Sequence, residues 1–131
     1  MRWFLITDNN EYSAILENTL KTAEKSNKLI CCSFNNDELK KQKKNFLDFA
    51  ACIIYSNKED CLDIGNILQI SGFFAAYKIP VFTNFGSISN NTIFNKDGIK
   101  YFETFDSICN YISKKYKAIA LDSKQRLAKK K

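Results

Sequence analysis

Residues 50–55, Ala-Ala-Cys-Ile-Ile-Tyr, form a nearly continuous apolar run. Side chains alternate between the two faces of a β-strand, so a strand that is apolar throughout must be covered on both faces. Such strands are typical of parallel sheets that carry helices on both sides. The run therefore predicts a strand inside a parallel sheet, and an antiparallel or all-helical core would contradict this prediction.

Short apolar runs alternate along the chain with stretches in which apolar residues recur every three or four positions. Strands followed by helices indicate an α/β fold with right-handed crossovers. We expect a doubly wound, flavodoxin- or Rossmann-like parallel sheet of about five strands with helices on both faces. The predicted strands lie near 3–6, 29–32, 50–55, 80–85 and 99–102, and the predicted helices at 12–25, 37–49, 62–78 and after a capping Thr104.

The 131 residues suit one domain, which we place at 1–121, followed by a basic C-terminal tail at 122–131. Residues 114–131 hold eight basic residues and one acidic residue, which gives +7. The whole chain carries +6, so residues 1–113 carry −1, the difference between the two values. We expect the tail to be a solvated helix end that adds little to folding, with nucleic-acid binding through it as the less favoured interpretation.

No apolar run reaches the roughly 18 residues that a membrane span needs, and the N-terminal apolar stretch is too short for a signal peptide. We therefore expect a cytoplasmic protein without a membrane partner. The chain has no histidine, and its five cysteines include no Cys-x-x-Cys pair, so neither a metal site nor a disulfide framework is indicated. Catalysis would have to use carboxylates, hydroxyls, thiols or lysines. Phosphate-binding glycine motifs are absent, and we expect no cofactor.

Polar residues follow the predicted strands at their carboxyl ends, where open parallel sheets bind ligands. Such a rim of hydroxyls, amides and carboxylates suits the hydroxyl groups of a sugar better than a triphosphate. The alternative interpretation is that these loops are polar because they face water. The rim consists of Thr7, Asp8, Asn9, Asn10, Ser33, Asn35, Ser56, Asn57, Glu59, Asp60, Asp63, Thr83, Asn84, Gly86 and Ser87.

Residues 60–82 read Asp-Cys-Leu-Asp-Ile-Gly-Asn-Ile-Leu-Gln-Ile-Ser-Gly-Phe-Phe-Ala-Ala-Tyr-Lys-Ile-Pro-Val-Phe. This segment resembles the core of the nucleoside 2-deoxyribosyltransferase family, which carries an Asp, a helix with Glu-x-Gly-Tyr-Ala, and a Lys-Pro-Val strand entry. The interval from Gly72 to Pro80 and the aromatic-Ala pattern carry the likeness. The resemblance implies a pocket for a nucleoside or nucleotide. It also implies a homo-oligomer, most simply a dimer, in which the helix at 62–78 packs against a second subunit.

The sequence departs from that family at the nucleophile. The family's catalytic Glu stands two residues before the glycine, where this chain has Ile70, or Ile67 in a shifted alignment. Neither can attack an anomeric carbon, so we expect N-glycosidic bond transfer or hydrolysis to be weak or absent. Asp60 and Asp63 are the candidate catalytic residues. The candidate substrate-binding residues are Asp8, Asn66 and Asn84.

A second resemblance keeps another function open. Residues 4–12 look like the first strand and acidic turn of response-regulator receiver domains, and Thr83 stands where those domains keep a hydroxyl. The phospho-accepting Asp and the Lys-Pro pair are missing, so the alternative is a pseudo-receiver that acts as a non-enzymatic signalling or interaction module. A Toll/interleukin-receptor-like hydrolase would also need a helix Glu that is absent. A nucleoside binder should have a sugar-sized pocket between strands one, three and four, and a pseudo-receiver should have side chains there.

Overall fold

The computed structural model contains a five-stranded, fully parallel sheet in the order β2-β1-β3-β4-β5. It describes residues 1–34, 41, 48–57, 64–85 and 98–129. This strand order confirms the predicted doubly wound sheet and is the flavodoxin-like variant of that fold. The strands are β1 (Arg2–Ile6), β2 (Lys28–Cys32), β3 (Phe49–Ile54), β4 (Val81–Thr83) and β5 (Ile99–Tyr101).

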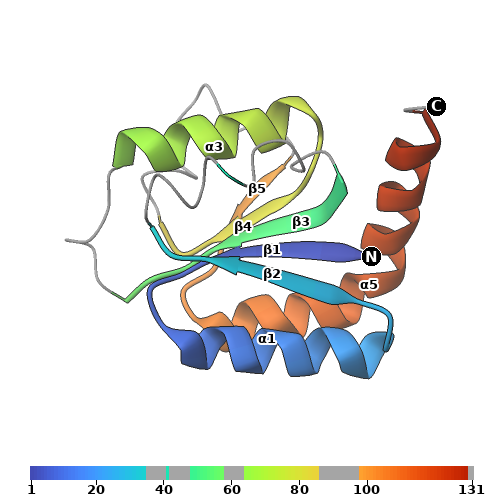
Figure 1. Ribbon diagram of the computed structural model, residues 1–131, viewed down its shortest axis with the longest axis horizontal. Coiled ribbons are helices and arrows are strands. Elements are labelled where there is room, and N and C mark those ends of the chain that lie inside the picture. The colour runs from blue at the N-terminus through green and yellow to red at the C-terminus, as the bar shows by residue number, and fades with distance from the viewer. Residues whose placement is uncertain (35–40, 42–47, 58–63, 86–97, 130–131) are drawn as a thin grey trace.

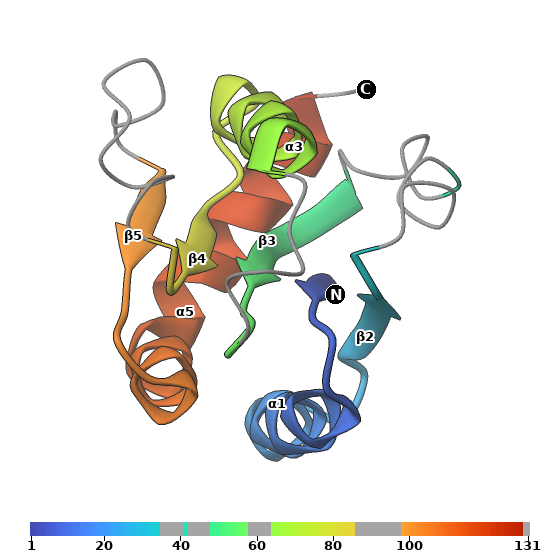
Figure 2. The ribbon, with the colours of Figure 1, turned by 90° about the vertical axis from the view of Figure 1, so that its left-hand side faces the viewer.

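Helices cover both faces of the sheet, as predicted (Figures 1 and 2). Helix α3 (Ile64–Ala76) lies on one face, and α1 (Asn10–Ala23) and α5 (Phe105–Lys129) lie on the other. Thr104 caps α5 as expected, because its hydroxyl accepts a hydrogen bond from the Ser107 amide at 3.1 Å. The helix predicted at 37–49 falls almost entirely outside the described residues.

The side chains of β3 explain why its sequence is apolar throughout. All six residues of this strand are buried. Cys52 and Ile54 belong to the core cluster on the α3 side, whereas Ala51 and Ile53 belong to the cluster under α1 and α5. A strand between two helical layers has no face that contacts water, which is the condition that the sequence indicated.

The amino ends of the strands are closed by the C-terminal part of α5. Figure 1 shows α5 starting beneath the sheet beside α1 and then turning upward past the amino ends of β1 and β3. There the Arg126 guanidinium donates hydrogen bonds to the carbonyls of Lys78 at 3.2 Å, Phe49 at 3.3 Å and Ala50 at 3.2 Å. Ser123, one turn earlier, is buried.

These contacts run against the expectation that residues 122–131 add little to folding. Residues 122–129 continue α5 instead of leaving the domain as a solvated end. The physical reason is the long arginine side chain, whose planar fork of donors reaches the backbone carbonyls of Lys78, Phe49 and Ala50. The tail is basic in composition, but its Arg126 side chain forms hydrogen bonds with the backbone of the folded domain.

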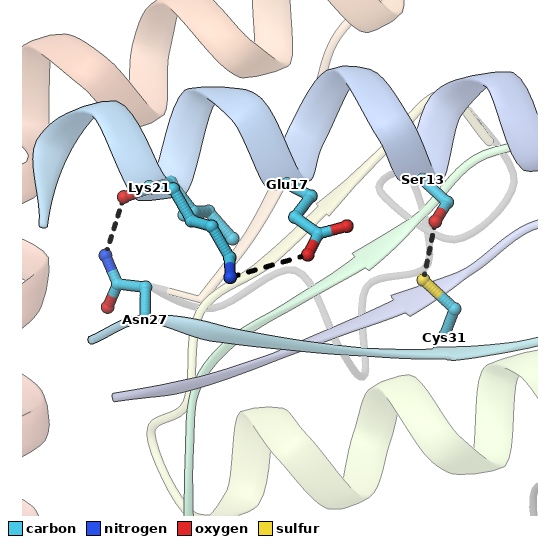
Figure 3. A network of polar contacts seen from close by, with 6 residues as sticks. Ser13, Glu17, Lys21, Asn27 and Cys31 are labelled. Atoms are coloured by element: carbon cyan, nitrogen blue, oxygen red, sulfur yellow. Dashed lines mark hydrogen bonds and ion pairs between the residues drawn. The ribbon is translucent and has the colours of Figure 1, made fainter. Parts of the chain in front are cut away.

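Asn27 organises a second polar cluster at the same end of the sheet. Its side chain accepts the Trp3 indole N–H at 3.1 Å and donates to the Leu20 carbonyl at 2.8 Å and the Tyr116 hydroxyl at 2.9 Å. Figure 3 shows the bond to the end of α1, and at the other end of that helix the Cys31 thiol lies 3.3 Å from the Ser13 hydroxyl. Hydrogen bonds therefore join α1 to β2 and to the turn before β2, one near each end of the helix.

Candidate functional site

The candidate site lies where β1, β3 and β4 end, at the edge that Figure 2 views nearly head-on. The sheet order places β1 between β2 and β3, so the connections leaving β1 and β3 diverge to opposite sides at this point. Divergence of this kind opens a crevice outside the strand ends in open α/β sheets. The residues that follow these three strands are therefore the ones to examine for binding.

Three polar side chains from the three strand ends are joined by hydrogen bonds. The Ser56 hydroxyl donates to the Asp8 carboxylate at 2.7 Å. The Asn84 amide donates to the Ser56 carbonyl at 2.7 Å and its oxygen accepts from the Ser56 amide at 3.3 Å. Asp8 is exposed, Asn84 is half-buried and Ser56 is buried. Two of the three predicted substrate-binding residues, Asp8 and Asn84, thus belong to one cluster, which we call the Asp8–Ser56–Asn84 cluster.

The hydroxyls of Thr7 and Thr83 shape the turns beneath this cluster. The Thr7 hydroxyl accepts the Asn9 amide at 3.4 Å, and the Thr83 hydroxyl accepts the Phe85 amide at 3.1 Å. Both threonines are buried. Asn9 in turn caps α1 by accepting the Glu11 amide at 2.9 Å. These bonds turn the chain sharply after each strand, so that Asp8 and Asn84 both reach Ser56.

Aromatic rings adjoin the cluster where β3, α1 and α5 meet. The rings of Tyr12 and Tyr55 have centroids 4.7 Å apart, and each lies near Phe105, at 4.7 and 5.1 Å respectively. The Tyr12 hydroxyl accepts a hydrogen bond from the Asn57 amide, which places both groups beside the strand ends. Sequence reasoning treated Tyr12 as part of the apolar stripe of its helix. The short spacing between Asp8 and Tyr12 in the sequence was the signal that the Tyr12 side chain also reaches the polar rim at the strand ends.

Ile70, which stands where the resemblance would place a nucleophile, packs against the core. Ile70 is half-buried on α3 and packs against the cluster that contains Phe4, Ile6 and Phe74. Residues 64–76 contain no acidic side chain. The candidate catalytic residues Asp60 and Asp63 lie outside the described residues, and Asn66 is described only as part of α3, without its side chain.

Three of the described thiols have a pKa above the ordinary cysteine value. Burial raises the pKa of Cys109, and it raises the pKa of the fully buried Cys52 strongly. Burial also raises the pKa of Cys31, although the hydrogen bond with Ser13 opposes the shift. Since the thiolate is the reactive form, these three side chains are not suited to covalent catalysis. The described residues also contain no group of three or more Cys, Asp or Glu that could hold a metal ion.

The carboxyl edge carries negative charge among the described residues. Asp8 follows β1, Glu11 lies in the first turn of α1, and Asp106 lies in the first turn of α5. Fixed carboxylates repel a phosphate group and accept hydrogen bonds from hydroxyls and amines. Chemically, the edge suits a neutral polar molecule with several hydrogen-bond donors.

Comparisons with protein-family models, with curated proteins and with solved structures returned no match to this chain. Among the described helices, none has the length and apolar character that crossing a membrane requires.

Proposed function

We propose that this chain is a nucleoside 2-deoxyribosyltransferase-like protein that binds a nucleoside and transfers its sugar weakly or not at all. The observation that supports the proposal is the Asp8–Ser56–Asn84 cluster, which brings a carboxylate, a hydroxyl and an amide from three strands to one place. Sugar hydroxyls and base edges are recognised by such groups.

Each member of the cluster has a separate role in this proposal. The exposed Asp8 carboxylate accepts one hydrogen bond from Ser56 and has lone pairs left for sugar hydroxyls. Asn84 holds Ser56 through two bonds to its backbone, so Ser56 positions the carboxylate. Asn57, exposed beside Tyr12, presents an amide for the base. The acidic edge favours a nucleoside over its phosphate.

Binding is tested by calorimetry with deoxynucleosides and their monophosphates. Asp8→Asn should weaken nucleoside binding by about tenfold, the loss expected for a hydrogen bond to a charged group. Asn84→Ala should also weaken binding, because Ser56 then loses the two backbone bonds that hold it beside Asp8. The matched control is Asp106→Asn, which removes an exposed carboxylate at the same edge but outside the cluster. The monophosphate should bind more weakly than the nucleoside. Equal affinities for all three variants and the unaltered chain would refute the assignment of the cluster.

Catalysis is tested by chromatography of a deoxynucleoside incubated with a second free base. With isoleucine at the nucleophile position, a deoxyribosyl-enzyme cannot form there, and the remaining route is direct attack of water assisted by Asp60 or Asp63. We expect no swapped nucleoside and at most slow hydrolysis. Robust base exchange would show that another carboxylate acts as nucleophile. Asp60→Asn and Asp63→Asn would then identify it, because the nucleophile variant loses nearly all rate.

The second candidate function is a pseudo-receiver-type interaction module. The observation that favours it is that described groups at the strand ends already bond to one another, with the Ser56 hydroxyl on Asp8 and the Asn84 side chain on the Ser56 backbone. In such a module the edge would be a protein-binding surface. Absence of any nucleoside or nucleotide binding at about 1 mM ligand, where even weak sites are occupied, would favour this candidate.

A homo-oligomer, most simply a dimer, is part of the proposal. Residues 64–76 of α3 carry no charged side chain. At the end of this helix Tyr77 is exposed, with its ring 4.9 Å from that of Phe73. Sedimentation should show a dimer at micromolar concentration, and Tyr77→Lys should shift it toward monomer. A monomer at that concentration would remove this part of the proposal.

A further inference from the structure

A hollow of about 420 Å³ lies between α5 and the amino ends of β4 and β5. One wall consists of one face of α5, from Tyr111 through Lys115 and Ile119 to Asp122, which recur at helical spacing. The other wall consists of Phe82 and the β5 residue Lys100. We call this hollow the β5–α5 groove. Its volume is in the range of pockets that hold small molecules.

The floor of the groove is apolar and aromatic. Phe82 and Ile119 are almost fully buried, and the rings of Phe82 and Tyr111 meet edge to face with centroids 5.4 Å apart. Aromatic rings arranged in this way offer a flat ligand both a face and an edge to pack against.

The rim of the groove carries two cations, one on each wall. Lys100 lies with its ammonium 5.0 Å from the centre of the Tyr111 ring, and Lys115 is exposed on α5. Neither lysine forms an ion pair with a described residue. Asp122 lies one turn before Arg126, and its charge opposes the lowering of the Arg126 pKa by burial, so part of that charge is balanced within α5. Among the described residues that line the groove, two lysines thus stand against one aspartate.

We propose that the β5–α5 groove binds a small molecule that consists of a flat aromatic body and one anionic group. The aromatic body packs against the half-buried Pro80 and Tyr111 and the exposed Ala118, and the anionic group is attracted by Lys100 and Lys115. The groove begins at the residues that precede β4 and β5, at the end of the sheet opposite the Asp8–Ser56–Asn84 cluster. It is a separate site, and it does not depend on the proposed nucleoside binding.

The test uses 8-anilinonaphthalene-1-sulfonate, an aromatic anion whose fluorescence reports binding, with the folded full-length chain. We expect saturable binding at one site. Lys100→Gln and Lys115→Gln should each weaken it by about fivefold, the effect of one favourable surface charge. Ala118→Trp, at an exposed position in the groove wall, should abolish it by filling the space. Uncharged N-phenyl-1-naphthylamine should bind more weakly than the sulfonate.

The matched controls are Lys114→Gln and Lys117→Gln, which remove neighbouring exposed lysines of α5 that do not line the groove. Both controls should keep the affinity within about twofold of the unaltered chain. Equal losses in control and groove variants would show binding to general positive charge and would overturn the proposal. Unchanged binding in Ala118→Trp would overturn it too. Added deoxynucleoside should leave the dye bound, and displacement would contradict the separation of the two sites.

Discussion

The two ends of the sheet use polar side chains in different ways. At the amino ends, Asn27 and Arg126 bond to buried backbone carbonyls and to an indole N–H, and Asn27 is only 1% exposed. At the carboxyl ends, Asp8 bonds to another side chain, and its carboxylate is exposed. Both ends are rich in hydrogen bonds and both include buried polar groups, such as Ser56 and Thr83 at the carboxyl ends, so the contrast lies between the enclosed Asn27 and the exposed Asp8.

This difference separates residues that hold the fold from residues that are free to bind. A buried donor or acceptor that loses its partner costs about 1–3 kcal/mol, because water cannot replace the partner. An exposed carboxylate that loses its partner is solvated at once, so its removal costs little stability. Substitutions at the amino end should therefore change the free energy of unfolding, and substitutions at the carboxyl end should change binding.

The largest expected effect is removal of the C-terminal part of α5. A chain that ends at Leu121 loses the bonds of Arg126 to Lys78, Phe49 and Ala50 and the buried Ser123. We expect a loss of about 3 kcal/mol and a melting temperature lower by roughly 10 °C. Arg126→Ala alone should give a large part of this loss, and Gln125→Ala, at an exposed position, almost none. An unchanged melting temperature would restore the view that this segment is only a solvated end.

The next effect concerns Asn27. Asn27→Ala leaves the buried Trp3 indole N–H without its partner. It also removes one of the two hydrogen bonds that described residues make to the Leu20 carbonyl, which still accepts the Glu24 amide at 3.0 Å. We expect denaturant unfolding to show a loss of about 2 kcal/mol. The control is Asn18→Ala on the exposed side of α1, which should lie within about 0.5 kcal/mol of the unaltered chain. Equal stability of the two variants would show that the amino end is not held by this network.

A smaller effect of opposite sign is expected at Lys78. This residue follows α3 with a φ of 61°, the left-handed conformation in which a Cβ atom is unfavourable. Lys78→Gly should stabilise the chain by about 0.5–1 kcal/mol while keeping the carbonyl that accepts from Arg126. Ala76→Gly, within the last turn of α3, should destabilise it instead. A loss of stability in Lys78→Gly would mean that the lysine side chain matters more than its backbone conformation.

The smallest effect is the pH dependence that Glu24 contributes. Hydrogen bonds from Tyr116 at 2.8 Å and Ser26 at 3.1 Å lower the pKa of this carboxyl group. A carboxylate with a lowered folded pKa adds stability above its unfolded pKa of about 4.3 and loses it as the pH falls through the folded value. Glu24→Gln should thus be slightly less stable than the unaltered chain at pH 7, with the difference vanishing in acid. A difference that grew on acidification would contradict the direction of the shift.

The fold was predictable because its signals are local. The apolar run at 50–55 and the capping Thr104 are each visible within a few residues, and both were confirmed. Arg126 gave no such signal. It lies in a basic C-terminal segment, and such a segment is typical of a solvated helix end. Its role depends on the direction that α5 takes at the amino ends of the strands.

The site was predictable only in part. The polar rim follows from the rule that parallel sheets bind ligands at their carboxyl ends, and it included Asp8, Ser56 and Asn84, which the structure brings together. The contact of Ser56 with Asp8 joins residues 48 positions apart and depends on the placement of β3 next to β1. Strand order is a property of the whole sheet, so no local pattern revealed which members of the rim would meet.

The most direct test of the account is a titration of the isotope-labelled chain with 2′-deoxyadenosine, followed by amide chemical shifts. The account predicts saturable shifts at Asp8, Ser56, Asn57 and Asn84, with the amides that line the β5–α5 groove unchanged. The same titration of Asp8→Asn should produce shifts only at about tenfold higher nucleoside concentration. No shifts at the carboxyl ends at about 1 mM nucleoside, or shifts confined to the amino ends, would contradict the claim that the cluster is a binding site.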